Sequence, residues 1–443
     1  MSMLDEFVGA LLAVGDAPLP DDVAHETRRC LLNVLGTTIG ASRAAEVDAM
    51  VGCALECGGA ELAPPGRAEA LDRLFAATVI GFCGHFDDYD DTHLETVIHP
   101  GAATLGALYP LAVLAGSDGT SALKAMALGV ESQLRVGIAM SPSHYDLGWH
   151  ITGTCGVVGA AVAAGVLLGA DLAAQAAAIE LAVNAAVGHR EAFGTPVKPF
   201  HAGKAAANGL LAALLVAAGA EGSPGVLERE GGYFHALSDL WSAEVLSPAD
   251  VERRWALLDN TYKPFPCGIV AHPAIEAAIG LHELLGPEPD GEVAAVRVDC
   301  NPLVVELMGR PSAATGLEAR FCALHGVACG LLFGRAGLAE FSDALASDPV
   351  VDALRRRATL APDEAVGRES ARVTVTLAGG AERSVEVAVA SGSSGRPLTD
   401  QQLLDKFTAL VEPVLPGRAA RLADAAMALG KGSTISDLQA VMA

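Results

Sequence analysis

Apolar residues recur at helical spacing through roughly the first 290 positions of the chain. One helix is predicted to begin at Asp21 or Asp22, after Pro20, with Cys30 and Val34 on its apolar stripe. No alternating strand pattern appears in this part, so it is predicted to be all-helical. The predicted helices are two within the first sixty residues, and then 67–83, 101–116, 120–139, 154–168, 171–187 and 204–219.

A different pattern begins after about residue 286. Alternating apolar and polar residues flank Gly379-Gly380, which predicts a β-hairpin. A small α+β domain is therefore predicted over roughly 265–398, between the helical part and a helical tail. The predicted elements of this domain are a strand over 293–300, hairpin strands over 372–378 and 384–390, and a flexible link over 391–395. The predicted tail consists of a helix capped by Thr399 and Gln402 and a helix over 419–428.

Composition narrows the classes of partner. The chain has 443 residues, which suits two domains, and 51% of them are hydrophobic whereas only 5% are aromatic. Abundant alanine and glycine favour closely packed helices. The net charge of -24 argues against nucleic acid or an anionic membrane surface as a partner. An anionic substrate would need a local cluster of positive charge.

The nine cysteines lack zinc-ribbon or thioredoxin spacing, so free thiols in a reducing cytosol are expected. Asp5 and Glu6 lie at an N-terminus without a basic segment, and a signal peptide is not expected there. Residues 151–170 carry no charge, but they are mostly Ala, Gly and Thr. A buried core helix is therefore favoured over a membrane span.

Charge is concentrated in one stretch, Asp87–Gly101, which lies between apolar segments. Buried carboxylates are costly unless they are paired, hydrogen-bonded or bound to a ligand, so the stretch indicates a site. A solvated acidic loop is the alternative. Thr92 and Glu95 fit a helix capping box, which leaves Asp88, Asp91 and His99 to be explained in another way.

Lysine is rare, six residues in all, yet Lys198 and Lys263 both stand in the tripeptide Lys-Pro-Phe. A residue before proline is disfavoured in the α region, so both are predicted to lie extended in loops and to contribute little to stability. His201 follows the first lysine and His272 follows the second. The pattern indicates a pair that holds an anion; two solvated loop lysines are the alternative.

Other polar residues extend this set. Tyr145 and His150 lie in a polar loop before an uncharged helix, whose N-terminal N–H groups favour anions. Arg320 and His325 fall on a predicted helix, where His325 could equally be a core residue. No dinucleotide or phosphate loop, serine elbow or zinc motif is present. General acid–base chemistry on a small anion, without cofactor or metal, is expected.

Four strings carry a resemblance to the MmgE/PrpD family. They are D-D-Y-D-D-T-H-L-E-T-V-I-H-P-G, G-W-H-I-T-G-T, V-K-P-F-H-A-G-K-A-A and Y-K-P-F-P-C-G-I-V-A-H-P, in that order. The resemblance implies a large helical domain built from residues 1–264 and 399–443. It also implies a smaller α+β lid domain over 265–398, a site between the two, and a homodimer.

The resemblance places family site positions on specific residues. The family string K-F-S-x-x-Y reads R-F-C-A-L-H here, so Arg320 replaces the lysine and His325 replaces the tyrosine. His201, His272, Arg320 and His325 are expected to bind substrate together with Thr92. The residues expected to carry catalysis are Asp88, His99, Tyr145, His150, Lys198 and Lys263.

The family includes 2-methylcitrate dehydratase, cis-aconitate decarboxylase and iminodisuccinate epimerase, and the sequence leaves the reaction open among them. A lyase acting on a small di- or tricarboxylate is favoured, and epimerisation of an amino-dicarboxylate is the alternative. Outside the family, Asp87, Asp88 and Asp91 match the aspartate-rich motif of magnesium-dependent terpenoid synthases, although a second such motif is missing. A non-catalytic carboxylate-binding protein also remains open.

Overall fold

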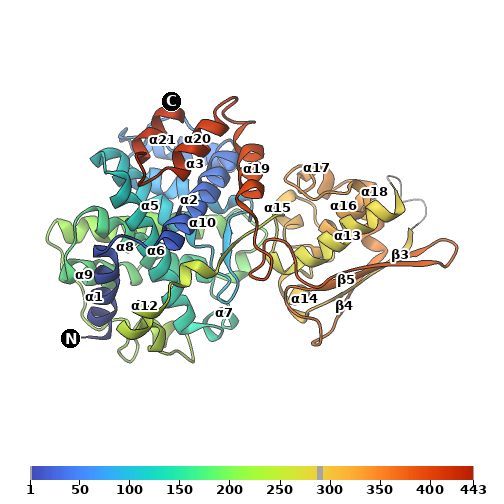
Figure 1. The fold of residues 1–443 in the computed structure, drawn as a ribbon, viewed down its shortest axis with the longest axis horizontal. Coiled ribbons are helices and arrows are strands. Elements are labelled where there is room, and N and C mark those ends of the chain that lie inside the picture. Colours follow the sequence, from blue (N-terminus) through green and yellow to red (C-terminus); the bar gives the residue numbers. More distant parts are fainter. Residues whose placement is uncertain (1, 287–292, 443) are drawn as a thin grey trace.

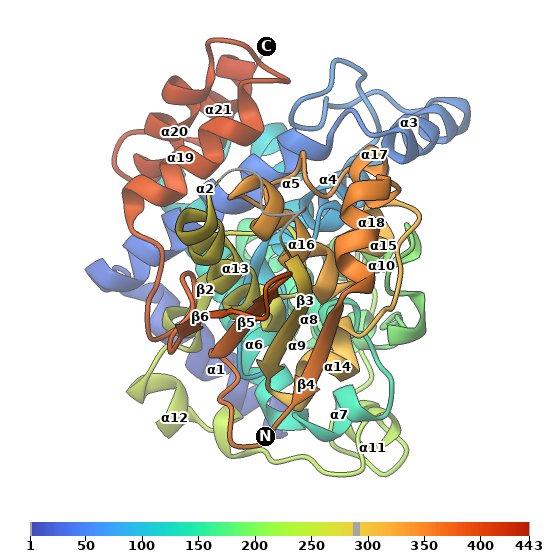
Figure 2. The same ribbon diagram turned by 90° about the vertical axis from the view of Figure 1, so that its right-hand side faces the viewer.

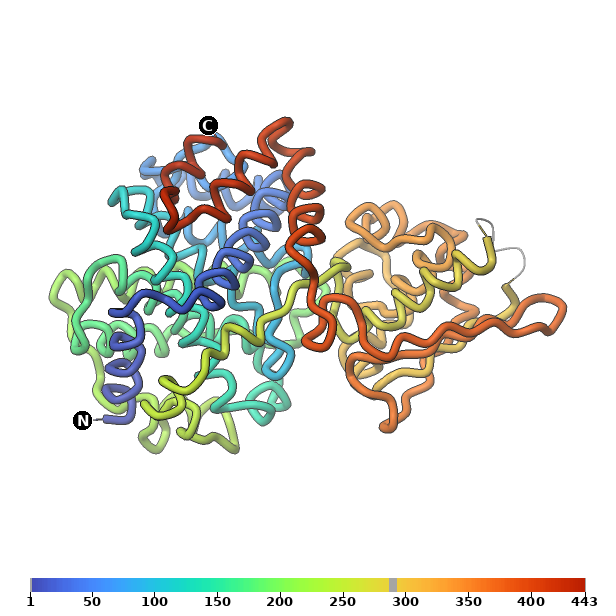
Figure 3. The backbone as a smooth tube through the Cα atoms, viewed as in Figure 1, coloured from blue at the N-terminus to red at the C-terminus, as the bar shows by residue number. Residues whose placement is uncertain are grey.

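The computed structural model describes residues 2–286 and 293–442, which form two lobes (Figure 1). One hydrophobic core joins residues between Leu4 and Tyr262 to residues between Leu398 and Leu438. A second core lies between Cys267 and Val375. The chain therefore crosses between the lobes twice, as the tube in Figure 3 shows. The predicted fold is confirmed: a mainly α protein with a helical domain built from both chain ends and a smaller α+β domain.

Closely packed Ala- and Gly-rich helices form the centre of the helical domain. Helix α10 packs against α4, α5, α8 and α9, and a Cβ atom on Gly106 would lie 2.6 Å from that of Ala206. By length and composition α10 could also cross a membrane, but 56% of its most apolar window is buried here. The helices are α1 Met3–Asp16, α2 Asp21–Ala41, α3 Ala45–Cys57, α4 Arg73–Phe86, α5 Pro100–Ala115, α6 Gly119–Met140, α7 Ser143–Asp146, α8 Ile151–Leu167, α9 Leu172–Val183, α10 Val197–Ala217, α11 Tyr233–Leu237 and α12 Pro248–Arg253.

The C-terminal helices complete this domain. Helix α19 (Asp400–Val411) begins with the predicted capping box of Thr399 and Gln402 and packs against α2. Helix α20 (Ala419–Met427) also contacts α2, and α21 (Ile435–Met442) contacts α5. These last helices lie beside the blue N-terminal part of the chain in Figure 1.

The α+β domain is built on a four-stranded sheet of order β4-β3-β5-β6, seen from its side of the molecule in Figure 2. Strands β3 and β4 are parallel, whereas β5 and β6 form the predicted antiparallel hairpin. Helix α13 contacts β5 and β6, and α16 packs on α13. The elements are α13 His272–Leu285, β3 Val293–Cys300, α14 Pro302–Met308, α15 Gly316–Ala319, α16 Ala323–Phe333, α17 Asp343–Ala346, α18 Pro349–Arg356, β4 Ala358–Pro362, β5 Ala371–Leu377 and β6 Glu382–Val387.

Several local predictions are wrong. The helical domain contains a two-stranded sheet, in which β1 (Asp91–His93) pairs with β2 (Asn260–Tyr262). Thr92 therefore lies in a strand and caps no helix. The first sixty residues hold three helices, because α3 follows α2 after a short turn. The segment 391–395 is an ordered turn, in which the Ser391 N–H donates to Glu276.

Asp91 ties this small sheet to α5. Its carboxylate accepts the Gly101 N–H at 3.1 Å and the Asn260 side-chain amide at 2.8 Å. An anion at a helix N-terminus satisfies free backbone donors there. A Cβ atom on Gly101 would lie only 2.6 Å from the Asp91 carboxylate. The acidic stretch is thus held rigidly between α5 and β2.

We expect Gly101→Ala to lower the free energy of unfolding by ~1–3 kcal/mol, because the added methyl group overpacks a site that cannot expand. Gly52→Ala is the matched control, since it also lies within a helix but a Cβ there meets nothing within 4 Å. Chemical denaturation followed by circular dichroism measures both variants. Equal stability of Gly101→Ala and the wild type would show that Asp91 does not constrain α5.

Candidate active site

Sequence-distant segments converge on a small pocket of about 50 Å³ at the boundary between the two domains. The turn after α4 supplies Asp88, the N-termini of α5 and α8 supply His99 and His150, and the first turn of α10 supplies Lys198. We call this cavity the inner pocket. The predicted site residues that line it are Asp88, Thr92, His99, Tyr145, His150, Lys198 and Lys263.

Asp88 lies between the two lysines. Its carboxylate is 2.6 Å from the Lys198 ammonium and 2.9 Å from the Lys263 ammonium. Lys263 also donates to the Asp88 carbonyl oxygen at 2.9 Å. All three side chains are buried. The loop prediction is wrong for Lys198, which lies in a helix, and neither lysine is a solvated surface group.

These charges fix the protonation of the cluster. Burial alone would raise the pKa of Asp88, but the two ammonium groups outweigh it and hold that pKa far below its usual range. Burial lowers the pKa of Lys198, against the opposing attraction of Asp88. Asp88 is therefore ionised at neutral pH.

Lys406 from α19 supports this arrangement from behind. Its ammonium donates to the carbonyl oxygens of Tyr89 at 2.7 Å and Lys263 at 2.9 Å, and to the Asn33 side chain at 2.7 Å. It thereby joins the backbone beside Asp88 to the backbone of Lys263. A helix from the end of the chain thus positions both sides of the ion pair.

A buried carboxylate, Asp90, holds two imidazoles. Its oxygens lie 2.7 Å from Nδ1 of His85 and 3.2 Å from Nδ1 of His99. Burial would raise the pKa of Asp90, but the two histidines bring it well below its usual range. The same Nδ1 atom of His99 also lies 3.2 Å from the Thr92 hydroxyl, and its Nε2 atom lies 3.9 Å from the Asp88 carboxylate.

His150 faces the same pocket from the start of α8. Its Nδ1 atom lies 3.0 Å from Nδ1 of His201, and its ring stacks on His85 at 5.4 Å. Its Nε2 atom is buried without a partner among the described residues. Burial, followed by the charge of Lys198, brings the pKa of His150 well below its usual value. Burial likewise lowers the pKa of His99, so both rings are neutral at pH 7.

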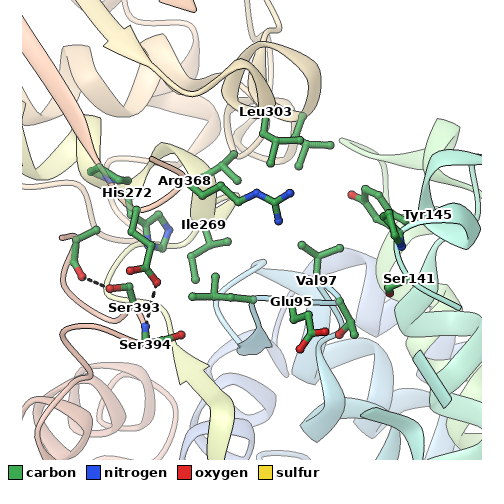
Figure 4. Close-up of a pocket in the computed structure, with 18 of the residues that line it drawn as sticks. Glu95, Val97, Ser141, Tyr145, Ile269, His272, Leu303, Arg368, Ser393 and Ser394 are labelled. Carbon is green, nitrogen blue, oxygen red and sulfur yellow. Dashed lines mark hydrogen bonds between the residues drawn. The ribbon is translucent and has the colours of Figure 1, made fainter. Parts of the chain in front are cut away.

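A larger cavity of about 380 Å³, which we call the outer chamber, adjoins the inner pocket. Tyr145 lines both cavities, and its ring lies 3.9 Å from the Arg190 guanidinium carbon. His272 lines only the outer chamber and lies 3.2 Å from the Cys267 carbonyl oxygen. Figure 4 shows this chamber with Arg368 pointing into it.

Three predicted residues line neither cavity. His201 contacts the ring of His150 but does not reach the inner pocket itself. Arg320 forms a buried ion pair with Asp87 at 2.5 Å, which joins the α+β domain to the end of α4. His325 is buried in the core of the α+β domain, 2.8 Å from the Glu340 carbonyl oxygen. His325 is therefore a core residue, which was the alternative to its predicted role in substrate binding.

A metal ion is a further possibility for this cluster. One ligand atom from each of His85, Asp88, Asp90 and His99 lies within 4.8 Å of the others. However, the lysine ammonium groups already contact Asp88 at 2.6 and 2.9 Å and would repel a cation. The donor set therefore fits an internal ion-pair network better than a metal centre.

Three further residues of this cluster, His85, Asp90 and Lys406, are not predicted by the sequence patterns. His85 lies in the last turn of α4, beyond the end predicted for that helix. The sequence does contain one signal for the His85–Asp90 pair. His85 is a polar residue at the end of an apolar helix, and Asp90 follows it five residues later. Lys406 gave no local signal, because its partners lie far away in the sequence.

Comparison with known proteins decides the family. The model of the MmgE/PrpD N-terminal domain matches residues 11–245, and the model of the C-terminal domain matches residues 265–430. The chain belongs to the MmgE/PrpD family. This confirms the resemblance seen in the sequence and identifies the chain as an MmgE/PrpD-type enzyme.

Named relatives of this MmgE/PrpD enzyme include lyases. Human cis-aconitate decarboxylase is 30% identical over 362 residues, which cover 78% of this chain and 74% of that protein. Cis-aconitate decarboxylase of Aspergillus terreus is 33% identical over 33% of this chain and 31% of that protein. The 2-methylcitrate dehydratase of Cupriavidus necator is 31% identical over 26% of each chain.

The ion-pair geometry predicts an order of stability among charge variants. Asp88→Asn leaves two buried ammonium groups without their anion, so we expect it to lower the free energy of unfolding by ~3–5 kcal/mol. Lys198→Met and Lys263→Met each leave one balanced pair and should cost less. Urea denaturation measures all three variants.

The pH dependence provides a second measure of the same effect. Burial lowers the pKa of Lys198 and Asp88 opposes this, so without Asp88 the folded state holds the Lys198 proton less tightly than the unfolded state does. The unfolded state then binds more protons, so the stability of Asp88→Asn should rise with pH in the alkaline range. A lysine variant less stable than Asp88→Asn would contradict this charge balance.

Proposed function

We propose that this enzyme is a lyase that removes CO2 or water from a small carboxylate by proton transfer, without a cofactor. One observation carries the proposal: a shared lysine–aspartate ion pair and two neutral histidines face the same small pocket. The names of the relatives, cis-aconitate decarboxylase and 2-methylcitrate dehydratase, support this reaction class.

The lysines are suited to hold the substrate carboxylate. An ammonium group has three N–H donors, and Lys198 uses one of them in its hydrogen bond to Asp88. The remaining donors can bind a substrate oxygen. Because the two ammonium groups are buried, their attraction for a carboxylate is stronger than it would be in water.

The histidines are suited to move the proton. The His99 Nε2 atom can accept a proton when Nδ1–H faces the Asp90 carboxylate, which lies 3.2 Å away. His150 takes the complementary role when His201 donates to its Nδ1 atom, which leaves Nε2–H directed at the pocket. In a dehydration, His99 takes the C–H proton as the C–O bond breaks, and His150 donates its Nε2–H to the hydroxyl, which leaves as water; the proton on His99 then restores neutral His150. In a decarboxylation no C–H bond breaks: CO2 leaves, the carbanion takes a proton from His150, and His150 regains one from solvent.

A substrate panel tests the proposal directly. The purified enzyme is incubated in deuterated buffer with cis-aconitate, 2-methylcitrate and related carboxylates, and NMR follows CO2 loss, water loss and hydrogen exchange. We expect loss of CO2 or water from at least one compound, undiminished by EDTA because the lysines occupy the cation position. Exchange alone would favour an epimerase, and loss of activity in EDTA that magnesium restores would favour metal-dependent chemistry.

The two histidines provide the mutational test. We expect His99→Gln and His150→Gln each to lower kcat by ~10²-fold or more, since glutamine keeps the hydrogen bonds but moves no proton. His325→Gln is the control, because that buried histidine lies outside both cavities. It should keep near-normal kcat.

The pH profile separates catalytic from structural loss in these variants. The burial that lowers the pKa of His99 places the acid limb of kcat/KM below the range of an ordinary histidine. Activity should fall as pH drops through that limb, because the base becomes protonated. The limb should disappear from the residual activity of His99→Gln. Normal turnover in both variants would rule out this acid–base assignment.

A further inference from the structure

The two adjoining cavities differ in size. The inner pocket encloses about 50 Å³ and the outer chamber about 380 Å³. Small-molecule sites usually enclose ~300–1,000 Å³, so the inner pocket holds only part of a substrate. Both cavities are lined by Val97, Tyr145, Ile269, Val270 and Leu307. A substrate that reaches the lysines therefore continues past these residues into the outer chamber.

The junction between the cavities has an unusual backbone. Val97 has a φ of +56°, a conformation that is rare for a β-branched residue. Its N–H donates to the His93 carbonyl oxygen at 2.7 Å, which helps to hold this turn. Such conformations persist only where the surrounding structure fixes them. The turn after β1 thus sets an apolar side chain at the boundary of both cavities.

The outer chamber differs from the inner pocket in chemistry. Its walls include Leu94 from the helical domain and Ile269, Leu303 and Leu307 from the α+β side. Among the described residues that line it, the charged ones are predominantly acidic: Glu95, Asp146 and Glu369 accompany one cation, Arg368. A carboxylate would meet a net negative lining there, whereas a hydrocarbon chain would leave water for apolar walls.

We propose that the substrate carries its carboxylate groups at one end and an uncharged, largely hydrocarbon arm at the other. The carboxylate end binds Lys198 and Lys263, and the arm lies in the outer chamber. This inference rests on the proposed function and narrows its substrate class. It distinguishes this enzyme from one that takes a compact tricarboxylate with charge at every end.

Direct binding of inert probes tests the arm. Isothermal titration calorimetry compares succinate, ethylsuccinate and butylsuccinate with glutarate, adipate and pimelate, which carry a carboxylate at each end. We expect Kd to fall roughly fourfold for each methylene added to the alkyl arm, as for transfer of a methylene out of water. Lengthening the diacids should bring no such gain.

Two substitutions on α14 locate the effect. Leu303→Asn places an amide in the wall of the outer chamber and should flatten the dependence of Kd on arm length. Val305→Asn is the matched control, since Val305 lies on the same helix, is exposed and lines neither cavity. It should keep the wild-type dependence.

The outcomes separate the two proposals. One contrary outcome is that succinate binds while Kd does not change along the alkyl series, and another is that the longer diacids bind best. In either case the proposed hydrocarbon arm is wrong and the proposed function stands. An alkyl gain that survives Leu303→Asn also places the arm elsewhere. If no probe binds and no carboxylate is turned over, the proposed function fails and the arm fails with it.

Discussion

The site depends on one buried carboxylate shared by two ammonium groups. Isolated charges of either sign would be costly at this depth, and each of the three side chains is tolerated because the others are present. Asp88 itself has a φ of +50°, a conformation in which aspartate is less disfavoured than most residues. The strained turn directs its carboxylate between α10 and the segment after β2. The backbone conformation and the charge balance therefore both fix the position of the Asp88 carboxylate.

Around that point, the two domains contribute different chemistry. The helical domain supplies the charged and imidazole side chains. His99, His150 and Lys198 lie at the starts of α5, α8 and α10, whereas Asp88 follows α4 and Lys263 follows β2. The α+β domain supplies Ile269, Val270, Leu307 and Phe321, which cover the inner pocket with apolar groups. The charged side chains are buried beneath this cover, and burial strengthens their electrostatic interactions. The helical domain thus carries the polar groups of the inner pocket, and the α+β domain covers them.

The sequence predicted the parts of this site better than their conformations. Helical periodicity and the β-hairpin gave the fold class, and charge clustering with repeated Lys-Pro-Phe motifs pointed to most of the inner pocket. Predictions from short sequence motifs failed where tertiary contacts determine the backbone conformation. Lys198 precedes proline yet lies in the first turn of α10, and Thr92 matches a capping box yet lies in β1. His85, Asp90 and Lys406 were missed because their partners are set by packing between elements, which a linear pattern does not show.

The position of Lys406 has a consequence for how the enzyme is made. Ribosomes synthesise the chain from its N-terminus at ~5–20 residues per second, and 143 residues separate Lys263 from Lys406. For roughly 7–29 s the nascent polypeptide holds every lysine and histidine of the inner pocket but lacks the ammonium that joins the Tyr89 and Lys263 backbones. The pocket is therefore assembled last, after translation has passed the whole α+β insertion. An unfinished chain therefore has the lysines and histidines of the inner pocket without the ammonium group that joins their backbone segments.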